Sequence, residues 1–549
     1  MSLIQGGSDI KTTVMDHHGL VAAVCRDLGI IDKINARVGS KDPRRVIQPG
    51  LAVAAMIING LGFTNRRLYL TPQFFESKAI EYLFSADVAA TDFDAHTLGK
   101  ALDEISAYGS SRLYGEIAFE IAMEKNLLGE RTHLDTTSFS VHGEYNEDSN
   151  DAMVEVTYGF SKDHRPDLKQ VMMSLTMTGP ANIPIWMEPL NGNSSDKKSF
   201  HETISRVQAF QKELSYKNDF FWIADSALYT PDKLLSCPSV KWISRVPENI
   251  KCCSKLVKTP AHQFEWQFGD GGYQWVEVGT QHGGINQRWL LVFSKQAYER
   301  EKKTFMRRLE KEKIALSTSC WHLGNEVFDC PGDAEKSVQQ LKKSHRFHHV
   351  TYEIKALEKF AVPGRPNPMT PRITQGYQVL CVIEDNQESI NETLLKKGRF
   401  VLATNDLDDT KLPSKNILEQ YKEQQNVENG FRFLKDPWFM VNSFYVKTRR
   451  RIEALMMVMT LCLMVYNFAQ YRARQALQET NETVPNQVGK PINNPTLKWI
   501  FQIMEGISIV KTSTEAIITN IDVLRCKIIR LFGVTACQIY GLQPELAKL

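Results

Sequence analysis

The chain has 549 residues, which is too many for one hydrophobic core, so several domains are expected. With 42% hydrophobic and 23% charged residues, its composition is that of an ordinary globular protein, which excludes a disordered or fibrous chain. The net charge of only +3 excludes a uniformly basic protein, so any surface that binds nucleic acid must be local.

The ten cysteines are scattered, and no two of them have C-x-x-C spacing. This pattern argues against a zinc ribbon, and the length of the chain argues against a disulfide scaffold. The first residues, MSLIQGGSDIKTT, lack the basic and apolar regions of a signal peptide. We therefore expect a cytoplasmic protein with reduced thiols.

Residues 1–128 are predicted to form a helical N-terminal domain. Apolar residues recur at helical spacing over 20–38, 51–61 and 97–124. Short helices with basic connections suit a helix-turn-helix-like domain, in which Arg66 and Arg67 would contact DNA. A plain helical bundle with solvated arginines explains the same pattern equally well.

Residues 129–249 change to a strand-rich pattern. Strands are predicted over 132–141, 171–179, 182–190, 219–225 and 240–246, with a helix over 198–214. Strands and helices in this order favour a mixed α/β layer architecture. This region is the predicted first part of a core domain.

The alternation breaks over residues 250–395, which we interpret as a β-rich insertion. Antiparallel strands are predicted at 264–278 and 288–293, and a charged helix at 298–316. After a strand at 377–385, the α/β pattern resumes over 396–475 with a strand at 399–405 and a helix at about 412–434. Residues 476–549 are predicted to form a helical C-terminal region.

The apolar run from Ala454 to Phe468 raises the question of a membrane anchor. It is about 15 residues long, short of the roughly 20 that span a bilayer. We interpret it as a buried helix and expect no membrane partner.

Two aspartates stand out on the predicted strands. Asp135 lies within HLDTTSF, where a charged residue is out of place, and alternation puts it on the face of His133 and Thr137. Asp225 ends the apolar strand FFWIA, at the strand edge where α/β sheets bind ligands. Taken alone, each aspartate is more simply a structural residue, such as a turn or a helix cap.

A third element is the helix YKEQQNVENGFRFLK. Tyr421, Glu428 and Lys435 are about two helical turns apart, so they share one stripe, which Gln424 joins. A solvated charged helix would show the same stripe.

Together these residues resemble a known family. Tyr, two residues, Arg, three residues, Glu, six residues, Lys is the pattern of the insertion sequence four group of bacterial DDE transposases. The chain matches it at Tyr421, Glu428 and Lys435, and departs from it at Gln424. YGFSKDHRPDLKQV (158–171) and GNSSDKKSF (192–200) also resemble stretches of one branch of that group.

The resemblance implies a multidomain α/β protein with a ribonuclease-H-like mixed sheet, interrupted by the insertion. Asp135, Asp225 and Glu428 would be the catalytic carboxylates and would hold two Mg²⁺ ions, or Mn²⁺. The substrate would be double-stranded DNA, both transposon ends and target, bound by a homodimer, with no small-molecule substrate. Cleavage and strand transfer would follow a cut-and-paste route through a DNA hairpin.

Further residues are assigned to DNA by charge or aromatic character. Tyr421, Gln424, Arg432 and Lys435 would lie near the cut phosphate, with the role of Gln424 weakened by its lack of charge. Lys447, Arg449, Arg450 and Arg451 form a basic cluster that would neutralise phosphates, or would simply start a helix in solvent. Trp266, Trp275 and Trp289 are candidates for stacking on a displaced base, although strand tryptophans are more often core residues.

Two other functions stay open at this point. One is a DNA-binding protein derived from a transposase without catalysis, against which the presence of all three acidic residues speaks. The other is a metal-dependent nuclease without strand transfer.

Overall fold

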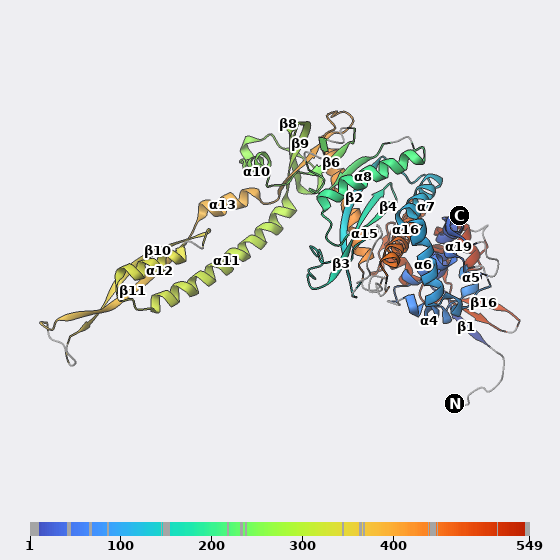
Figure 1. The fold of residues 1–549 in the computed structure, drawn as a ribbon, viewed down its shortest axis with the longest axis horizontal. Helices are drawn as coiled ribbons and strands as arrows, with labels where there is room; N and C mark the ends of the chain where they lie inside the picture. The colour runs from blue at the N-terminus through green and yellow to red at the C-terminus, as the bar shows by residue number, and fades with distance from the viewer. Residues whose placement is uncertain are drawn as a thin grey trace. The chain divides into compact units, whose positions relative to one another are not determined.

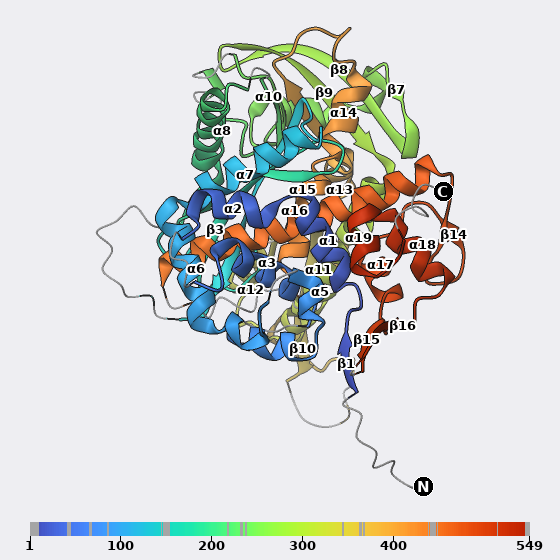
Figure 2. The same cartoon turned by 90° about the vertical axis from the view of Figure 1, so that its right-hand side faces the viewer.

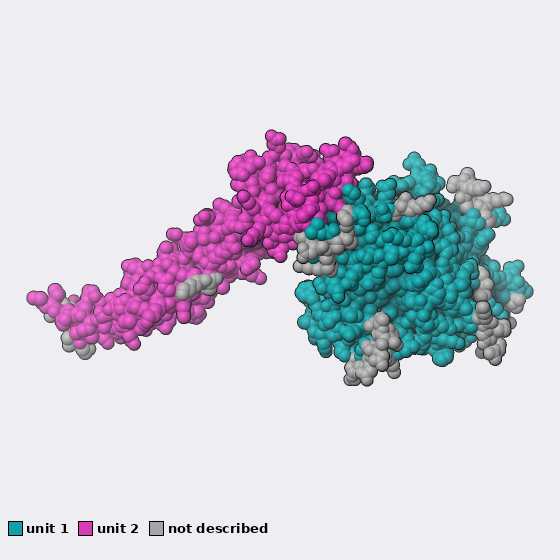
Figure 3. Space-filling model, turned by 45° about the horizontal axis from the view of Figure 1, so that its top comes forward, with its two compact units in different colours: residues 1–244, 418–549 teal, residues 245–417 magenta. Residues whose placement is uncertain are grey.

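The computed structural model describes residues 10–543 except 41–44, 65–67, 85–86, 144, 146–153, 217–218, 231–233, 236–238, 343–344, 362–364, 366–367, 437–438, 440–445, 447 and 513. The chain divides into two compact units (Figure 3). The first comprises Met1–Ser244 and Leu418–Leu549, and the second Arg245–Ile417. The predicted N-terminal and C-terminal regions therefore fold with the α/β core in one unit, whereas the predicted insertion falls within the other.

The first unit contains five neighbouring strands of a mixed sheet, in the order β4-β3-β2-β5-β6. Its strands are β2 (Arg131–Val141), β3 (Lys169–Thr178), β4 (Ile183–Leu190), β5 (Phe221–Ala224) and β6 (Trp242–Arg245). The first three are antiparallel neighbours, while β5 runs parallel to both β2 and β6. Helix α8 (Asp196–Glu213) packs on β2, β3 and β4 (Figure 1). This order of strands confirms the expected ribonuclease-H-like, mixed α/β fold.

Seven helices precede the sheet along the described chain. They are α1 (His18–Asp27), α2 (Ile30–Val38), α3 (Pro49–Gly60), α4 (Thr71–Glu76), α5 (Ile80–Phe84), α6 (Ala95–Tyr108) and α7 (Ser110–Glu124). The single helix predicted over 97–124 is wrong, because it breaks at Gly109. The backbone angle φ of Gly109 is +104°, a value that residues with a Cβ atom rarely adopt.

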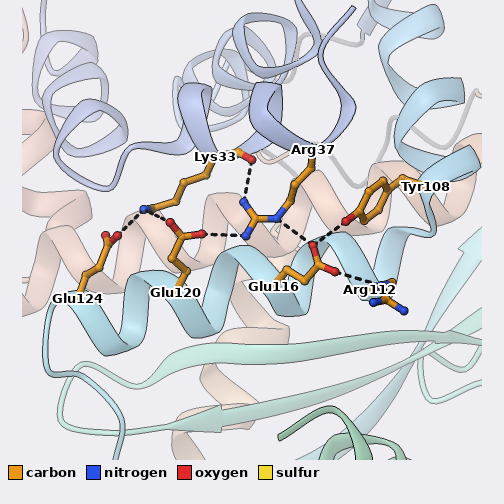
Figure 4. A network of polar contacts seen from close by, with 7 residues as sticks. All are labelled: Lys33, Arg37, Tyr108, Arg112, Glu116, Glu120 and Glu124. Carbon is orange, nitrogen blue, oxygen red and sulfur yellow. Dashed lines mark hydrogen bonds and ion pairs between the residues drawn. The ribbon is translucent and has the colours of Figure 1, made fainter. Parts of the chain in front are cut away.

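A network of ion pairs joins α2 to α7 (Figure 4). Lys33 contacts Glu120 and Glu124, and Arg37 contacts Glu116 and Glu120, at 2.7–2.9 Å. These side chains are partly exposed, so each pair contributes little alone, but the shared carboxylates fix the register of the two helices.

Helix α16 (Arg449–Glu479) is the core helix of the first unit. It packs against β4 and against α3 and α6 (Figures 1 and 2). It is the one described helix long and apolar enough to cross a membrane, but 83% of its most apolar stretch is buried inside the protein. The helix is longer than the apolar run suggested, and its burial agrees with the interpretation as a core helix.

The two ends of the described chain fold together. Strand β1 (Lys11–Val14), which was not predicted, pairs with β15 (Ser508–Lys511), itself paired with β16 (Ala516–Thr519). The ring of His17 stacks on Phe501 at 4.1 Å, and burial lowers the pKa of His17 to about 4. The remaining C-terminal elements are β13 (Val484–Pro485), β14 (Pro491–Ile492), α17 (Leu497–Ile503), α18 (Val523–Leu531) and α19 (Gly533–Ile539).

The second unit contains helices as well as strands. Strands β12 (Arg399–Thr404), β9 (Ile285–Ser294), β8 (Tyr273–His282) and β7 (Gln267–Phe268) are antiparallel neighbours in that order. The hairpin of β10 (His348–Phe360) and β11 (Arg372–Asp385) packs on α11 (Lys295–Asn325) and α12 (Pro331–Lys342). Two shorter helices are α10 (Lys251–Lys258) and α13 (Gln387–Lys396). The strand predicted at 399–405 forms β12, which pairs with β9.

Candidate active site

Asp135 and Asp225 lie side by side on neighbouring parallel strands. Leu134 of β2 and Ala224 of β5 form the last pair between these strands. Asp135 directly follows Leu134, and Asp225 directly follows Ala224. The two Cα atoms are therefore about 5 Å apart, with both side chains on one face of the sheet. One carboxylate oxygen of Asp225 accepts a hydrogen bond from the Ala227 N–H at 2.9 Å. The geometry thus brings together two of the three predicted carboxylates.

The predicted helix over 412–434 is interrupted. It forms α14 (Ser414–Lys422) and α15 (Gln425–Leu434), separated by a turn at residues 423–424. Tyr421 therefore belongs to α14, Glu428 to α15, and Lys435 directly follows α15. The prediction of one continuous helix is wrong: the helix is interrupted at Glu423 and Gln424, where the Gln424 side chain donates to the Leu134 carbonyl of β2.

Helix α15 lies along the same face of β2 that carries Asp135. At its start, Gln424 contacts the ring of His133 at 3.2 Å, and at its end the Lys435 ammonium lies 5.6 Å from the Phe139 ring centre. His133, Asp135 and Phe139 share one face, because strand side chains alternate. Glu428 lies about 6 Å along the helix from Gln424. Asp135 lies about 7 Å along the strand from His133. The two carboxylates are therefore level with each other.

Close packing of α15 depends on Gly430. A Cβ atom at this position would lie 3.2 Å from Leu463 of α16 and 3.3 Å from the sulfur of Met177 on β3. A Cβ there would require the ends of the Leu463 or Met177 side chains to move, so Gly430 suits the close approach of α15 to α16 and the sheet.

The carboxylates suit a hard divalent cation, since their ligand atoms are all oxygens. Glu428 is exposed, whereas Asp135 and Asp225 are half-buried. Among the described residues, no group of three or more His, Cys, Asp or Glu side chains is gathered closely enough to hold a metal ion. The pair of aspartates is in place, and Glu428 is level with Asp135 without joining it in a cluster.

Gln424 is buried and bound within the protein. Its side-chain amide donates to the Leu134 carbonyl at 2.9 Å, and its exposed fraction is 6%. This placement does not support the predicted contact with DNA.

The SKDHR motif contributes two side chains that the sequence did not single out as site residues. Lys162 donates to the carbonyl and hydroxyl of Thr136, the residue after Asp135, at 2.7 and 3.1 Å. Asp163 forms an ion pair with Lys435 at 2.7 Å. One loop therefore supplies the Lys162 ammonium beside the residue that follows Asp135 and the Asp163 carboxylate that pairs with Lys435. The resemblance marked this loop, but no local pattern marked its contacts.

Arg432 lines a basic hollow that the sequence did not predict. The hollow has a volume of about 560 Å³ and is lined by Arg432 of α15, Arg474 of α16 and Lys498 of α17, together with several asparagines. Lys498 also lies 3.5 Å from Asp436. Three separate helices supply these cations, so sequence spacing gave no sign of the hollow.

The described arginines of the basic cluster, Arg449, Arg450 and Arg451, differ in their contacts. Arg451 forms a bidentate ion pair with Asp103 of α6, at 2.8 and 2.6 Å, and Arg449 donates to the Tyr145 carbonyl at 3.2 Å. Arg450 is exposed at the start of α16. The contact of Arg451 supports an internal role, whereas Arg450 remains available to DNA. Lys447, like Arg66 and Arg67, lies outside the described residues.

Two of the three candidate tryptophans are core residues. Trp275 and Trp289 are 5% and 2% exposed, and both indole N–H groups donate to glutamine side chains. Trp266 is half-buried, with the Arg399 guanidinium 5.7 Å from its ring centre. Burial therefore disfavours base stacking by Trp275 and Trp289 and leaves Trp266 as the candidate.

Comparison with known proteins gives two family matches. A domain of unknown function (DUF4277) matches residues 10–119, and the transposase DDE domain matches residues 129–467. Curated proteins yield no match. Among solved structures, the chain is similar to the cryo-EM structure of the piggyBac transposase synaptic complex with hairpin DNA. The identity is 9% and the TM-score 0.37, over 90% of this chain and 82% of that one.

Proposed function

Because the chain belongs to the DDE transposase family, whose domain model covers most of its length, we propose that it cuts and joins the DNA ends of a mobile element. It would bind terminal inverted repeats and catalyse metal-dependent strand cleavage followed by strand transfer. The observation that carries this proposal is the adjacent register of Asp135 and Asp225, with Glu428 level with Asp135 on the facing helix. Within the family, the Tyr421, Glu428 and Lys435 spacing supports the insertion sequence four group.

The three carboxylates Asp135, Asp225 and Glu428 would hold two Mg²⁺ ions, or Mn²⁺. Such a pair of ions stabilises the attacking and leaving oxygens of a phosphodiester displacement. The side chains start in unequal positions, since Glu428 is exposed. Its helix would need to bring it nearer the aspartates when the metal and DNA are bound, as apo sites often tighten on binding.

Cations around the carboxylates would hold the DNA backbone. Lys435 lies at the end of α15, and Arg432, Arg474 and Lys498 surround the hollow beside that helix. Guanidinium and ammonium groups bind phosphate oxygens without reading the bases, so these residues would fix the position of the DNA rather than its sequence.

The expected partners are duplex DNA, as transposon ends and as target, and a second copy of the chain on that DNA. A cut-and-paste route through a hairpin is part of the proposal, as is a location in the bacterial cytoplasm at the nucleoid. A metal-dependent nuclease without strand transfer is the second candidate, because the same carboxylates would serve hydrolysis alone.

The proposal is tested with purified protein and duplexes that carry the ends of the DNA element encoding the chain. We expect Mg²⁺-dependent nicking at the ends and joining of the freed 3′ ends to target DNA. Nicking without joining would favour the nuclease, and end binding without nicking would favour a silent DNA-binding protein. Wild-type protein that neither binds nor cuts these ends would refute the proposal.

A further inference from the structure

Gln424 is buried beside the last pair of residues that joins β2 to β5. Strand β5 ends at Ala224, whereas β2 continues to Val141. The Glu130 carbonyl accepts a hydrogen bond from the Phe221 N–H, so it faces β5. Every second carbonyl of a strand faces the same side, so the Leu134 carbonyl faces β5 as well. The pairing of Leu134 with Ala224 gives this carbonyl a donor within the sheet, and the Gln424 amide donates to it as well, at 2.9 Å.

The oxygen of the Gln424 side-chain amide is also hydrogen-bonded. Its oxygen lies 3.2 Å from His133 Nδ1, and because a carbonyl oxygen only accepts, the imidazole must donate. The Glu423 carboxylate lies 3.7 Å from the second ring nitrogen, and the interaction with His133 lowers the pKa of Glu423. Gln424 and His133 are 6% and 5% exposed. A paired, buried network of this kind specifies one arrangement of the elements that it joins.

The elements joined are those that carry two of the carboxylates. Leu134 directly precedes Asp135, and the Glu428 N–H lies 3.4 Å from the Gln424 carbonyl, one helical turn earlier. We propose that Gln424 is a positioning residue, which fixes Glu428 relative to Asp135 and does not contact DNA. The inference rests on the proposed function, since the position of Glu428 matters only if it shares chemistry with Asp135.

The test replaces Gln424 by methionine. Gln424→Met keeps the length and flexibility of the side chain but removes both amide hydrogen bonds. Gln425→Met is the matched control, because Gln425 is the next residue and is exposed. We expect Gln424→Met to raise the Mg²⁺ concentration for half-maximal single-turnover cleavage by about 10- to 100-fold. Its Kd for end DNA should stay within about twofold of wild type, because phosphate contacts are retained.

Two further readouts separate positioning from folding. Mn²⁺ should recover part of the cleavage rate, because Mg²⁺ demands a nearly ideal octahedral site, and a misfolded fraction would gain nothing. In the absence of DNA, the Mn²⁺ concentration that stabilises the protein against thermal unfolding should also rise. If Gln424→Met does not fold, Gln424→Glu tests the same point, since it keeps the acceptor for His133 and loses the donor to Leu134.

The outcomes are distinguishable. A Gln424 variant with wild-type metal dependence would overturn the positioning role and leave the proposed function standing. A variant that weakened DNA binding as much as cleavage would show that Gln424 contacts DNA instead. A wild-type protein without metal-dependent cleavage would overturn the proposed function and the positioning role with it.

Discussion

Asp163→Asn should tighten binding of DNA. In the DNA-free protein, Lys435 donates to the Asp163 carboxylate at 2.7 Å, with side chains that are 22% and 35% exposed. If Lys435 binds a phosphate, this internal pair must first be broken. A partly exposed pair contributes about 1 kcal/mol at most, after screening by solvent. Removing that cost would lower Kd by up to about fivefold.

The assay is fluorescence anisotropy with labelled end DNA over a series of salt concentrations. Asp167→Asn is the matched control, because Asp167 lies in the same loop and pairs with Arg165 rather than with Lys435. The gain from Asp163→Asn should shrink as salt screens the ion pair, and it should vanish in a Lys435→Met background. An unchanged or higher Kd for Asp163→Asn, or an equal gain from Asp167→Asn, would refute the exchange of Asp163 for a phosphate.

Three further predictions address the chemistry, the DNA surface and the stability. Asp135→Asn, Asp225→Asn and Glu428→Gln should each lower single-turnover cleavage by roughly 10⁴-fold while end binding persists, and full activity in any of them would remove that residue from the catalytic set. Arg432→Ala should lower the slope of log Kd against log salt by about 0.9 for duplex DNA, and an unchanged slope would place this arginine off the DNA. The depressed pKa of His17, about 4 in the folded chain, means that the unfolded chain binds more protons below pH 6.5. Stability should therefore fall on acidification, by about 2 kcal/mol between pH 7 and pH 5 from this residue. In urea unfolding, His17→Gln should show a flatter pH dependence, and an equally steep one would contradict the assignment.

The strands of the core sheet could be predicted because their signal is local. Alternating apolar and polar residues with β-branched side chains mark β2, and a short apolar run marks β5. The family resemblance supplied the order of the three carboxylates, which periodicity alone cannot supply. Local patterns therefore predicted the elements, and the resemblance predicted which of their residues belong together.

What could not be predicted depends on contacts between distant residues. The segment YKEQQNVE has helical propensity throughout, so nothing local marks the turn at residues 423–424, where the Gln424 amide bonds to β2. The pairing of β1 with β15 joins two four-residue strands from opposite ends of the chain. The ion pair of Asp163 with Lys435 likewise joins a loop to a helix end far away in sequence.

Two backbone carbonyls of β2, one on each side of Asp135, explain why these side chains gather there. Buried backbone carbonyls need hydrogen-bond donors, and the two β2 carbonyls beside Asp135 that point toward β5 both accept from side chains. The Leu134 carbonyl accepts from the Gln424 amide and the Thr136 carbonyl from the Lys162 ammonium. Between them, the Asp135 side chain lies on the sheet face that α15 covers. These two backbone acceptors thus hold the helix and the loop around the aspartate pair.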